Sequence, residues 1–168
     1  MTVQKQEALD ALAASRRALH QAIRGLSQED MTQIQVEGVW TIKDVLGHIA
    51  SWEETYLVPL RRVADGGPFE AEVIEDYTPW NEKQAARKRR IPLSAILDEL
   101  DAVRQDLVTT ANRLSTEQWN RTMPFTWGGE GTVAQALDVL AEHEWDHVHT
   151  IQRWRETRDH VEPQRPTE

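Results

Sequence analysis

Apolar side chains recur with the period of an α-helix in four long segments, at about residues 4–25, 42–65, 93–114 and 133–158. In the first segment, the apolar residues near one face are Leu9, Leu12, Leu19, Ile23 and Leu26. A stripe of this kind is typical of an amphipathic helix that packs one face against its neighbours. We therefore expect four long helices that share a core.

Helix-capping residues stand before two of these segments. Thr41 can accept a hydrogen bond at the start of the second, with Asp44 three residues further on. Thr132 and Gln135 form the same capping pattern before the fourth. Pro59 lies inside the second segment, where it predicts a kink.

The links between the helices differ in length, and this difference predicts the topology. The first and third links are short, and the stretch "LSQED" is interpreted as the end of the first helix. The second link, residues 66–91, is long and includes "TPWNE", where Pro79 suits the first position of a short helix. No segment shows the alternation of a strand. We predict an all-α fold, a four-helix bundle with a long crossover between helices 2 and 3. Residues 1–158 would form its single domain and residues 159–168 a flexible tail.

Composition excludes several classes of function. The 168 residues include no cysteine, which rules out disulfides, thiolate metal sites and cysteine nucleophiles. The net charge of −9 argues against general affinity for nucleic acid, and the basic run "KQAARKRR" is interpreted as a solvated helix face. Neither a signal peptide nor a membrane-spanning segment is visible in the sequence. We expect a cytoplasmic protein that binds neither nucleic acid nor a membrane.

Three histidines lie close together in the fourth segment, within "AEHEWDHVHTI". On a helical wheel, His143 and His147 fall beside the apolar stripe, whereas His149 falls on the polar face. A spacing of four residues places two imidazoles one turn apart on the same side, which is the geometry that two ligands of one metal need. Ordinary hydrogen-bonded histidines are the alternative interpretation.

The letters "HEWDH" also match the HExxH motif of zinc peptidases. In that motif the glutamate, here Glu144, is the general base, and a third ligand usually lies further on. Glu144 falls on the buried side of the helix, so a peptidase remains an alternative. Short motifs of this kind arise often by chance in helices rich in Glu and His.

A third histidine, His48, lies beside the apolar stripe of the second segment. If the second and fourth helices are neighbours, His48 can meet His143 and His147, as in metal sites assembled inside helix bundles. Three imidazoles leave coordination positions open for water, a thiolate or a substrate oxygen. Trp52 and Tyr56, one and two turns beyond His48, are candidate pocket residues together with Glu144, although core packing would explain both rings. Glu53, Glu144 or Asp146 could orient a ligand imidazole, and the sequence does not choose among them.

Two stretches carry a resemblance to a known family. "GVWTIKDVLGHIASWE" and "WGGEGTVAQALDVLAEHEWDHVHTIQRW" resemble the tryptophan-led helix start and the H-x-x-x-H helix of the DinB/YfiT-like superfamily of metal-dependent enzymes. This superfamily is distinct from the DNA polymerase that shares the DinB name. The long connection with "PWNE" looks most like the ClbS/DfsB-type branch. The resemblance covers nearly the whole chain in the order of its helices.

This resemblance implies a four-helix bundle in which His48, His143 and His147 hold a divalent metal, most often zinc or nickel. It implies a hydrolase or thiol S-transferase acting on a small electrophile in stress or detoxification, with a low-molecular-weight thiol such as bacillithiol, mycothiol or glutathione as a possible partner. Many ClbS-type members lack the three histidines, so their presence here argues against a ClbS-like activity. Homodimers are common among such proteins, and we expect one here.

A non-catalytic bundle that binds a small molecule or a partner is the alternative function. Its histidines would be structural, and the seven tryptophans would supply apolar contact area. Trp145 falls away from the core stripe, which predicts an exposed ring in contact with another segment or a second subunit.

Overall fold

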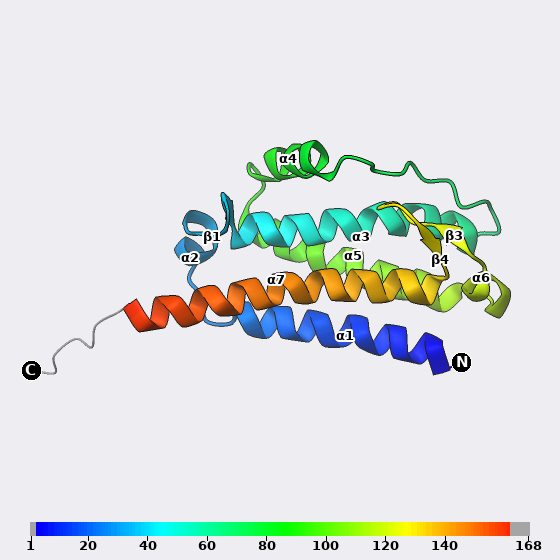
Figure 1. Cartoon of the computed structure of the whole chain (residues 1–168), viewed down its shortest axis with the longest axis horizontal. Helices are drawn as coiled ribbons and strands as arrows, with labels where there is room; N and C mark the ends of the chain where they lie inside the picture. Colours follow the sequence, from blue (N-terminus) through cyan, green and yellow to red (C-terminus); the bar gives the residue numbers. More distant parts are fainter. Residues whose placement is uncertain (1–2, 162–168) are drawn as a thin grey trace, which may run out of the picture.

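The computed structural model describes residues 3–161 and is an all-α fold built around four long helices (Figure 1). These helices are α1 (Val3–Ile23), α3 (Ile42–Ala64), α5 (Leu93–Arg113) and α7 (Val133–Val161). Helix α1 packs mainly against α7, and α3 packs mainly against α5. The crossover between α3 and α5 carries α4 (Tyr77–Lys88), which lies along the outer side of α3 in Figure 1. The predicted four-helix bundle with a long crossover is confirmed.

The predicted caps position two of the long helices. The Thr41 side chain accepts from the backbone N–H of Asp44, and the Asp44 carboxylate accepts from the backbone N–H of Thr41. Gln135 and Thr132 make the same reciprocal pair before α7, at 2.9 and 3.4 Å. Helix α7 continues to Val161, beyond the predicted end at residue 158. The predicted tail lies outside the described residues from residue 162 onward.

Two short helices were not predicted. They are α2 (Gln28–Gln33) and α6 (Thr116–Asn120). Each begins at a serine capping box, formed by Ser27 with Asp30 and by Ser115 with Gln118. The stretch "LSQED" therefore opens a helix as well as ending one. One or two turns are too short to show a helical period, so the capping box was the available signal.

The prediction that no segment forms a strand was wrong. Strand β1 (Gln35–Glu37) pairs antiparallel with β2 (Trp40–Thr41), and β3 (Met123–Pro124) pairs antiparallel with β4 (Glu130–Gly131). Strands of two or three residues are too short to show alternation of polar and apolar positions. The hairpins precede α3 and α7 and bring two loops towards the side of the bundle that carries the histidines.

The position of Pro79 also differs from the prediction. Helix α4 begins at Tyr77, so Pro79 is the third helical residue and not the first. It still lies in the first turn, where a backbone N–H has no acceptor within the helix and its loss costs little.

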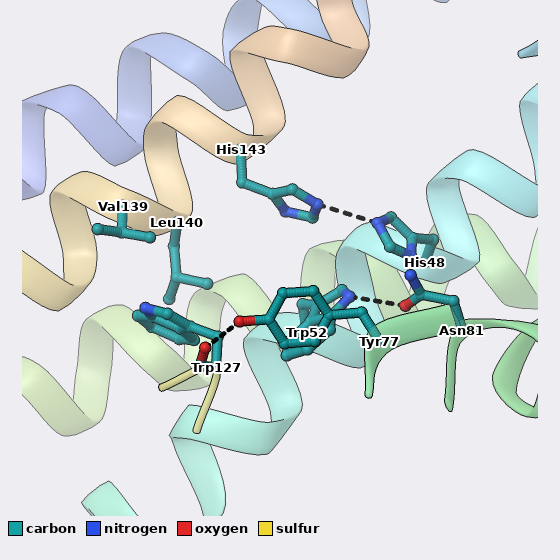
Figure 2. Close-up of a pocket in the computed structure, with 8 residues that line it drawn as sticks. All are labelled: His48, Trp52, Tyr77, Asn81, Trp127, Val139, Leu140 and His143. Carbon is teal, nitrogen blue, oxygen red and sulfur yellow. Dashed lines mark hydrogen bonds between the residues drawn. The ribbon is translucent and has the colours of Figure 1, made fainter. Parts of the chain in front are cut away.

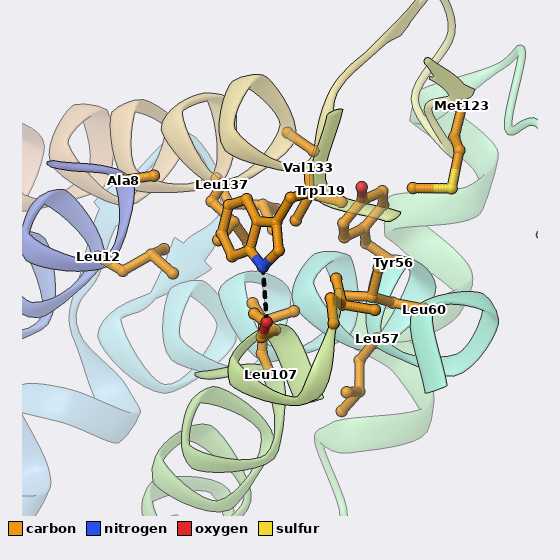
Figure 3. Packing of buried hydrophobic residues seen from close by; sticks show 14 of the residues in the cluster. Ala8, Leu12, Tyr56, Leu57, Leu60, Leu107, Trp119, Met123, Val133 and Leu137 are labelled. Atoms are coloured by element: carbon orange, nitrogen blue, oxygen red, sulfur yellow. Dashed lines mark hydrogen bonds between the residues drawn. The ribbon is translucent and has the colours of Figure 1, made fainter. Parts of the chain in front are cut away.

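The core consists of two apolar halves. One half surrounds Tyr56, Leu60 and Leu107, and Figure 3 shows it closed by Trp119, whose indole N–H donates to the carbonyl of Ala111 at 2.9 Å. The other half surrounds Ile42, Ile49, Ile96, Leu100 and Val148. Burial of these side chains supplies the main stabilisation of the bundle.

A buried layer of charged side chains lies between the two apolar halves. Each long helix contributes one residue: Arg16, Glu53, Arg104 and Glu144 are all at most 8% exposed. The Arg104 guanidinium contacts both carboxylates, reaching Glu144 at 2.8 Å, and Arg16 contacts both as well, at 3.1 Å from Glu53 and 2.6 Å from Glu144. Two positive and two negative charges balance, which is the condition for burying ions in a helix bundle.

The prediction that Trp145 is exposed was wrong. Its ring is half-buried and packs against the apolar half around Ile49, with its ring centroid 5.5 Å from that of His149. Its contact with another segment is therefore made within the chain, and Trp145 is not a free surface ring that would need a second subunit.

Candidate metal centre

Three histidines from two helices converge on one point. The Nε2 atom of His143 lies 2.9 Å from Nε2 of His48 and 3.1 Å from Nε2 of His147. One nitrogen of each ring falls within 4.8 Å of the others. His48 and His147 are buried, and His143 is half-buried. The structure thus brings together the three residues named from the sequence, and His149 is exposed on the opposite side of α7.

The helices determine this convergence. His143 and His147 lie one turn apart on α7, so their rings project from the same side of the helix. His48 lies on α3, which faces α7, and its ring packs 4.8 Å from the ring of Trp40. Trp40 belongs to the hairpin that leads into the capped start of α3. The hairpin therefore holds one face of the His48 ring in place.

A carboxylate from the same hairpin orients His147. Glu37 Oε2 lies 2.9 Å from Nδ1 of His147. This contact directs the other ring nitrogen, Nε2, towards His143 and His48. The hydrogen bond from His147 holds the pKa of Glu37 below its usual range. Glu37 thus stays ionised, as a carboxylate behind a metal-ligating histidine should be.

Sequence reasoning missed Glu37 and named Glu53, Glu144 and Asp146 for this role. Glu53 and Glu144 belong to the buried charged layer, and Asp146 is exposed. Glu37 lies on a three-residue strand outside any helical pattern, so helical phase could not detect it. No other signal in the sequence marks it.

Burial keeps the imidazoles of His48 and His143 uncharged. Burial, together with a smaller effect of the neighbouring histidines, lowers the pKa of His48 to about 2 and that of His143 to about 4. Both rings are therefore neutral at pH 7, and neutral imidazole is the form that ligates a metal.

The three rings fit a divalent metal ion. With metal–nitrogen distances of about 2.0–2.1 Å, two ligand atoms of a tetrahedral ion stand about 3.3 Å apart. Two of the three separations, 2.9 and 3.1 Å, are close to this value, and the three ligand atoms together lie within 4.8 Å of one another. A set of three imidazole nitrogens suits zinc, nickel, copper and iron, so the donors alone do not choose the metal.

A pocket of about 290 Å³ opens beside His48 and His143 (Figure 2). Its walls come from α3, α4, the β3–β4 loop and α7. The residues that line it are His48, Trp52, Tyr77, Asn81, Trp127, Val139, Leu140 and His143. The Tyr77 hydroxyl donates to the carbonyl of Trp127, and this bond joins the crossover to the β3–β4 loop.

The candidate pocket residues have different positions. Trp52 lines the pocket and donates its indole N–H to Asn81 Oδ1 at 3.0 Å. Tyr56 does not line it; the ring is fully buried in the core and packs on Phe69 and Trp127. Glu144 does not line it either.

The environment of Glu144 bears on the peptidase alternative. Its carboxylate is fully buried and accepts from Ser15, Arg16 and Arg104 in the charged layer. All of these partners lie in the interior of the bundle. The glutamate of the "HEWDH" string is therefore not available as a general base for a substrate at the three histidines.

Tyr56 allows a stability prediction. Among residues 3–161, no hydrogen-bond partner is found for its buried hydroxyl, and burial raises the pKa of this phenol. An unpaired buried hydroxyl costs about 1–3 kcal/mol, so Tyr56→Phe should leave the free energy of unfolding unchanged or raise it by about 1 kcal/mol. Urea unfolding measures this, with Tyr77→Phe as the control that removes a hydroxyl with a partner. A clear loss of stability in Tyr56→Phe would show that the hydroxyl is hydrogen-bonded in solution.

Two curated proteins resemble the chain in sequence. The uncharacterized protein YuaE of Bacillus subtilis is 27% identical over 143 residues, which cover 80% of this chain and 88% of YuaE. The protein named "Putative metal-dependent hydrolase OB0413", of Oceanobacillus iheyensis, is 24% identical over 131 residues, 77% of this chain and 73% of its own.

Three solved structures share the fold. YfiT from Bacillus subtilis, described as a probable metal-dependent hydrolase with an unusual four-helix bundle topology, has a TM-score of 0.72 at 18% identity and covers 95% of this chain and 90% of its own. The colibactin self-resistance protein ClbS, solved in complex with a dsDNA, has a TM-score of 0.74 at 15% identity, with 90% and 95% covered. The mycothiol-dependent maleylpyruvate isomerase has a TM-score of 0.73 at 14% identity; it covers 90% of this chain, which spans 63% of that protein.

The family is established by a match to a family model. The model of the DinB superfamily matches residues 11–151, which include all three histidines of the candidate metal centre and all four long helices in part or in full. The chain therefore belongs to the DinB superfamily.

Proposed function

We propose that this protein is a metal-dependent enzyme that activates water or a low-molecular-weight thiol for attack on a small electrophile. The observation that carries the proposal is the convergence of three imidazoles, two of which line a pocket. A centre with three protein ligands leaves positions for water or substrate, unlike a closed structural site. The "metal-dependent hydrolase" wording in the names of two similar proteins supports the same class.

The residues around the pocket have different roles in this proposal. His48, His143 and His147 would hold a divalent ion, zinc or nickel, through their Nε2 atoms. The chemistry that such an ion supplies is Lewis acidity, which lowers the pKa of water or of a thiol at neutral pH. Glu37 keeps the His147 ring in the required orientation through Nδ1. Trp52 and Trp127 line the side where a substrate would lie, and their rings would exclude water from it.

Metal analysis tests the proposal first. Protein purified without an affinity tag should contain about one divalent ion per chain by mass spectrometry. The loaded protein should then hydrolyse a small activated ester or transfer glutathione, bacillithiol or mycothiol to a small electrophile, and chelation should remove the activity. Protein that takes up neither zinc nor nickel on incubation would overturn the proposal and leave a non-catalytic binding bundle as the better account.

Glu37 provides a second test of the centre. Loss of a carboxylate behind a metal-ligating histidine typically costs about 10–100-fold in metal affinity, and Glu37→Ala should show a loss of this size. Glu37→Gln keeps an acceptor for His147 and should recover part of the affinity. The measurement is a competition titration with a chelating dye, with Glu29→Ala, at an exposed glutamate of α2, as the control. Equal affinities in Glu37→Ala and Glu29→Ala would remove Glu37 from the site.

The predictions about the substrate, nucleic acid, oligomeric state and location are also proposals. We propose a small-molecule substrate and no nucleic acid, on the basis of the net charge of −9 and the size of the pocket. The ClbS complex with dsDNA shows that a protein of this fold can bind DNA, so a DNA-binding assay belongs beside the activity screen. A homodimer and a cytoplasmic location stay predictions. None of the helices in the described part of the chain has the length and hydropathy that a bilayer crossing requires.

A further inference from the structure

The pocket beside the histidines is lined without any charged side chain. Asp, Glu, Lys and Arg make up 28% of the sequence, yet none of them is among the residues that line it. Its two histidines are buried or half-buried against other rings. A charged group that enters such a pocket loses its hydration and finds no opposite charge among the side chains of its walls, which is costly. The lining therefore selects against ionised groups.

Aromatic rings form most of the walls. Trp52 from α3, Tyr77 from α4 and Trp127 from the β3–β4 loop surround the opening in Figure 2, and Leu140 closes it on the side of α7. The ring of Tyr77 stands edge-on to that of Trp52, with centroids 5.5 Å apart. The Tyr77 hydroxyl is already engaged with the Trp127 carbonyl. These walls offer flat apolar surface and no free hydroxyl.

Asn81 supplies a directed polar group. Its Oδ1 accepts from the indole N–H of Trp52 at 3.0 Å, and this bond fixes which way the amide faces. Figure 2 shows the amide nitrogen on the side of His48. An amide nitrogen carries two N–H donors and no acceptor. Asn81 is therefore oriented to donate to an oxygen of a ligand close to the histidines.

We propose that this pocket binds a neutral, flat, apolar part of the electrophilic substrate, with a carbonyl-type oxygen held by the Asn81 amide beside His48 and His143. The inference rests on the proposed function in taking the pocket as the substrate side of the metal centre. It names Asn81 as a residue that determines specificity. Away from the metal ion, the walls offer no charged partner for the anionic groups of thiols such as glutathione, so a thiol would approach the ion from outside the pocket. The volume of about 290 Å³ lies near the lower end of the range for small-molecule sites and suits a single substituted ring.

Three probes of the same shape test the charge preference. Benzamide is neutral, benzoate is anionic and benzamidine is cationic. They are titrated into metal-free full-length protein at about pH 8, so that no ion attracts benzoate and the imidazoles stay neutral. The readout is the shift of the indole N–H resonances of Trp52 and Trp127 in ¹⁵N–¹H spectra. Benzamide should bind at least about tenfold more tightly than either charged probe.

Two substitutions test the residues. Asn81→Asp keeps an acceptor for Trp52 but removes both donors. The affinity for benzamide should therefore fall about three- to tenfold more than the affinity for toluene, which has no oxygen. Val139→Lys adds a cation at the wall and should shift the preference about fivefold or more towards benzoate. Val58→Lys adds the same charge at an exposed valine outside this pocket and should leave the preference unchanged.

The outcomes separate this inference from the proposed function. Charged probes that bind as well as benzamide, or an Asn81→Asp variant with unchanged benzamide affinity relative to toluene, would overturn the inference even if the protein binds metal. Selective benzamide binding by a protein that takes up no metal would support the ligand class and overturn the enzyme.

Discussion

Replacement of His143 by alanine should lower the affinity for zinc or nickel by at least about a hundredfold. Removal of a group that only orients a metal ligand costs about 10–100-fold, and removal of the ligand itself should cost no less. His143 is the central member of the three, since its Nε2 lies within 3.1 Å of Nε2 on both other rings. Without it, the remaining nitrogens belong to different helices and cannot complete a site with three protein ligands. His48→Ala should also lower the affinity strongly, because only the two α7 ligands, His143 and His147, would remain.

The measurement is a competition titration against a chelating dye, together with metal content by mass spectrometry. His149→Ala is the matched control, because His149 lies on the same helix and is exposed. Urea unfolding of the metal-free variants checks that each is folded. A folded His143→Ala protein that binds metal as tightly as His149→Ala would show that the ion, if any, is held elsewhere.

Replacement of Arg104 by methionine should lower the free energy of unfolding by about 3–5 kcal/mol, as expected when one partner of a buried ionic group is removed. Arg104 is 6% exposed and contacts the carboxylates of both Glu53 and Glu144. After the substitution, two buried carboxylates share only Arg16. The layer then carries an unbalanced charge in the interior of the bundle.

Arg61→Met is the control for this prediction. Arg61 pairs with Asp106 at the surface, where both side chains are about half exposed, and such pairs contribute about 0–1 kcal/mol. The double variant Arg104→Met/Glu53→Leu keeps the close Arg16–Glu144 pair at 2.6 Å and restores the charge balance. It should be more stable than Arg104→Met alone. Equal losses for Arg104→Met and Arg61→Met, or simple additivity in the double variant, would contradict the importance of charge balance in this layer.

The buried charged layer also shows a limit of sequence reading. Arg16, Glu53, Arg104 and Glu144 lie on four different helices, and each taken alone resembles a polar residue near the edge of an apolar stripe. Only the register of the four helices against one another places them at the same level. Glu144 was interpreted through its neighbours in the sequence, His143 and His147, whereas its contacts are with α1 and α5.

The sequence by itself determined the features that depend on local periodicity. Helical period and capping residues placed the four long helices, the length of residues 66–91 indicated the crossover, and phase on the helix separated His143 and His147 from His149. These signals arise within a few turns of chain, where side-chain spacing fixes which residues share a face.

Tertiary structure decided which groups meet across elements. His48 contacts His143 across two helices, and Glu37, on a three-residue strand, contacts His147. Tyr56 lies in the core, whereas Trp52 lines a pocket whose walls come from α3, α4, α7 and a loop. Such contacts depend on how helices pack and where short loops return, and neither has a period that can be read along the chain. For this reason the place of each histidine on its helix followed from the sequence, whereas the contact between the two helices, the carboxylate behind His147 and the walls of the pocket did not.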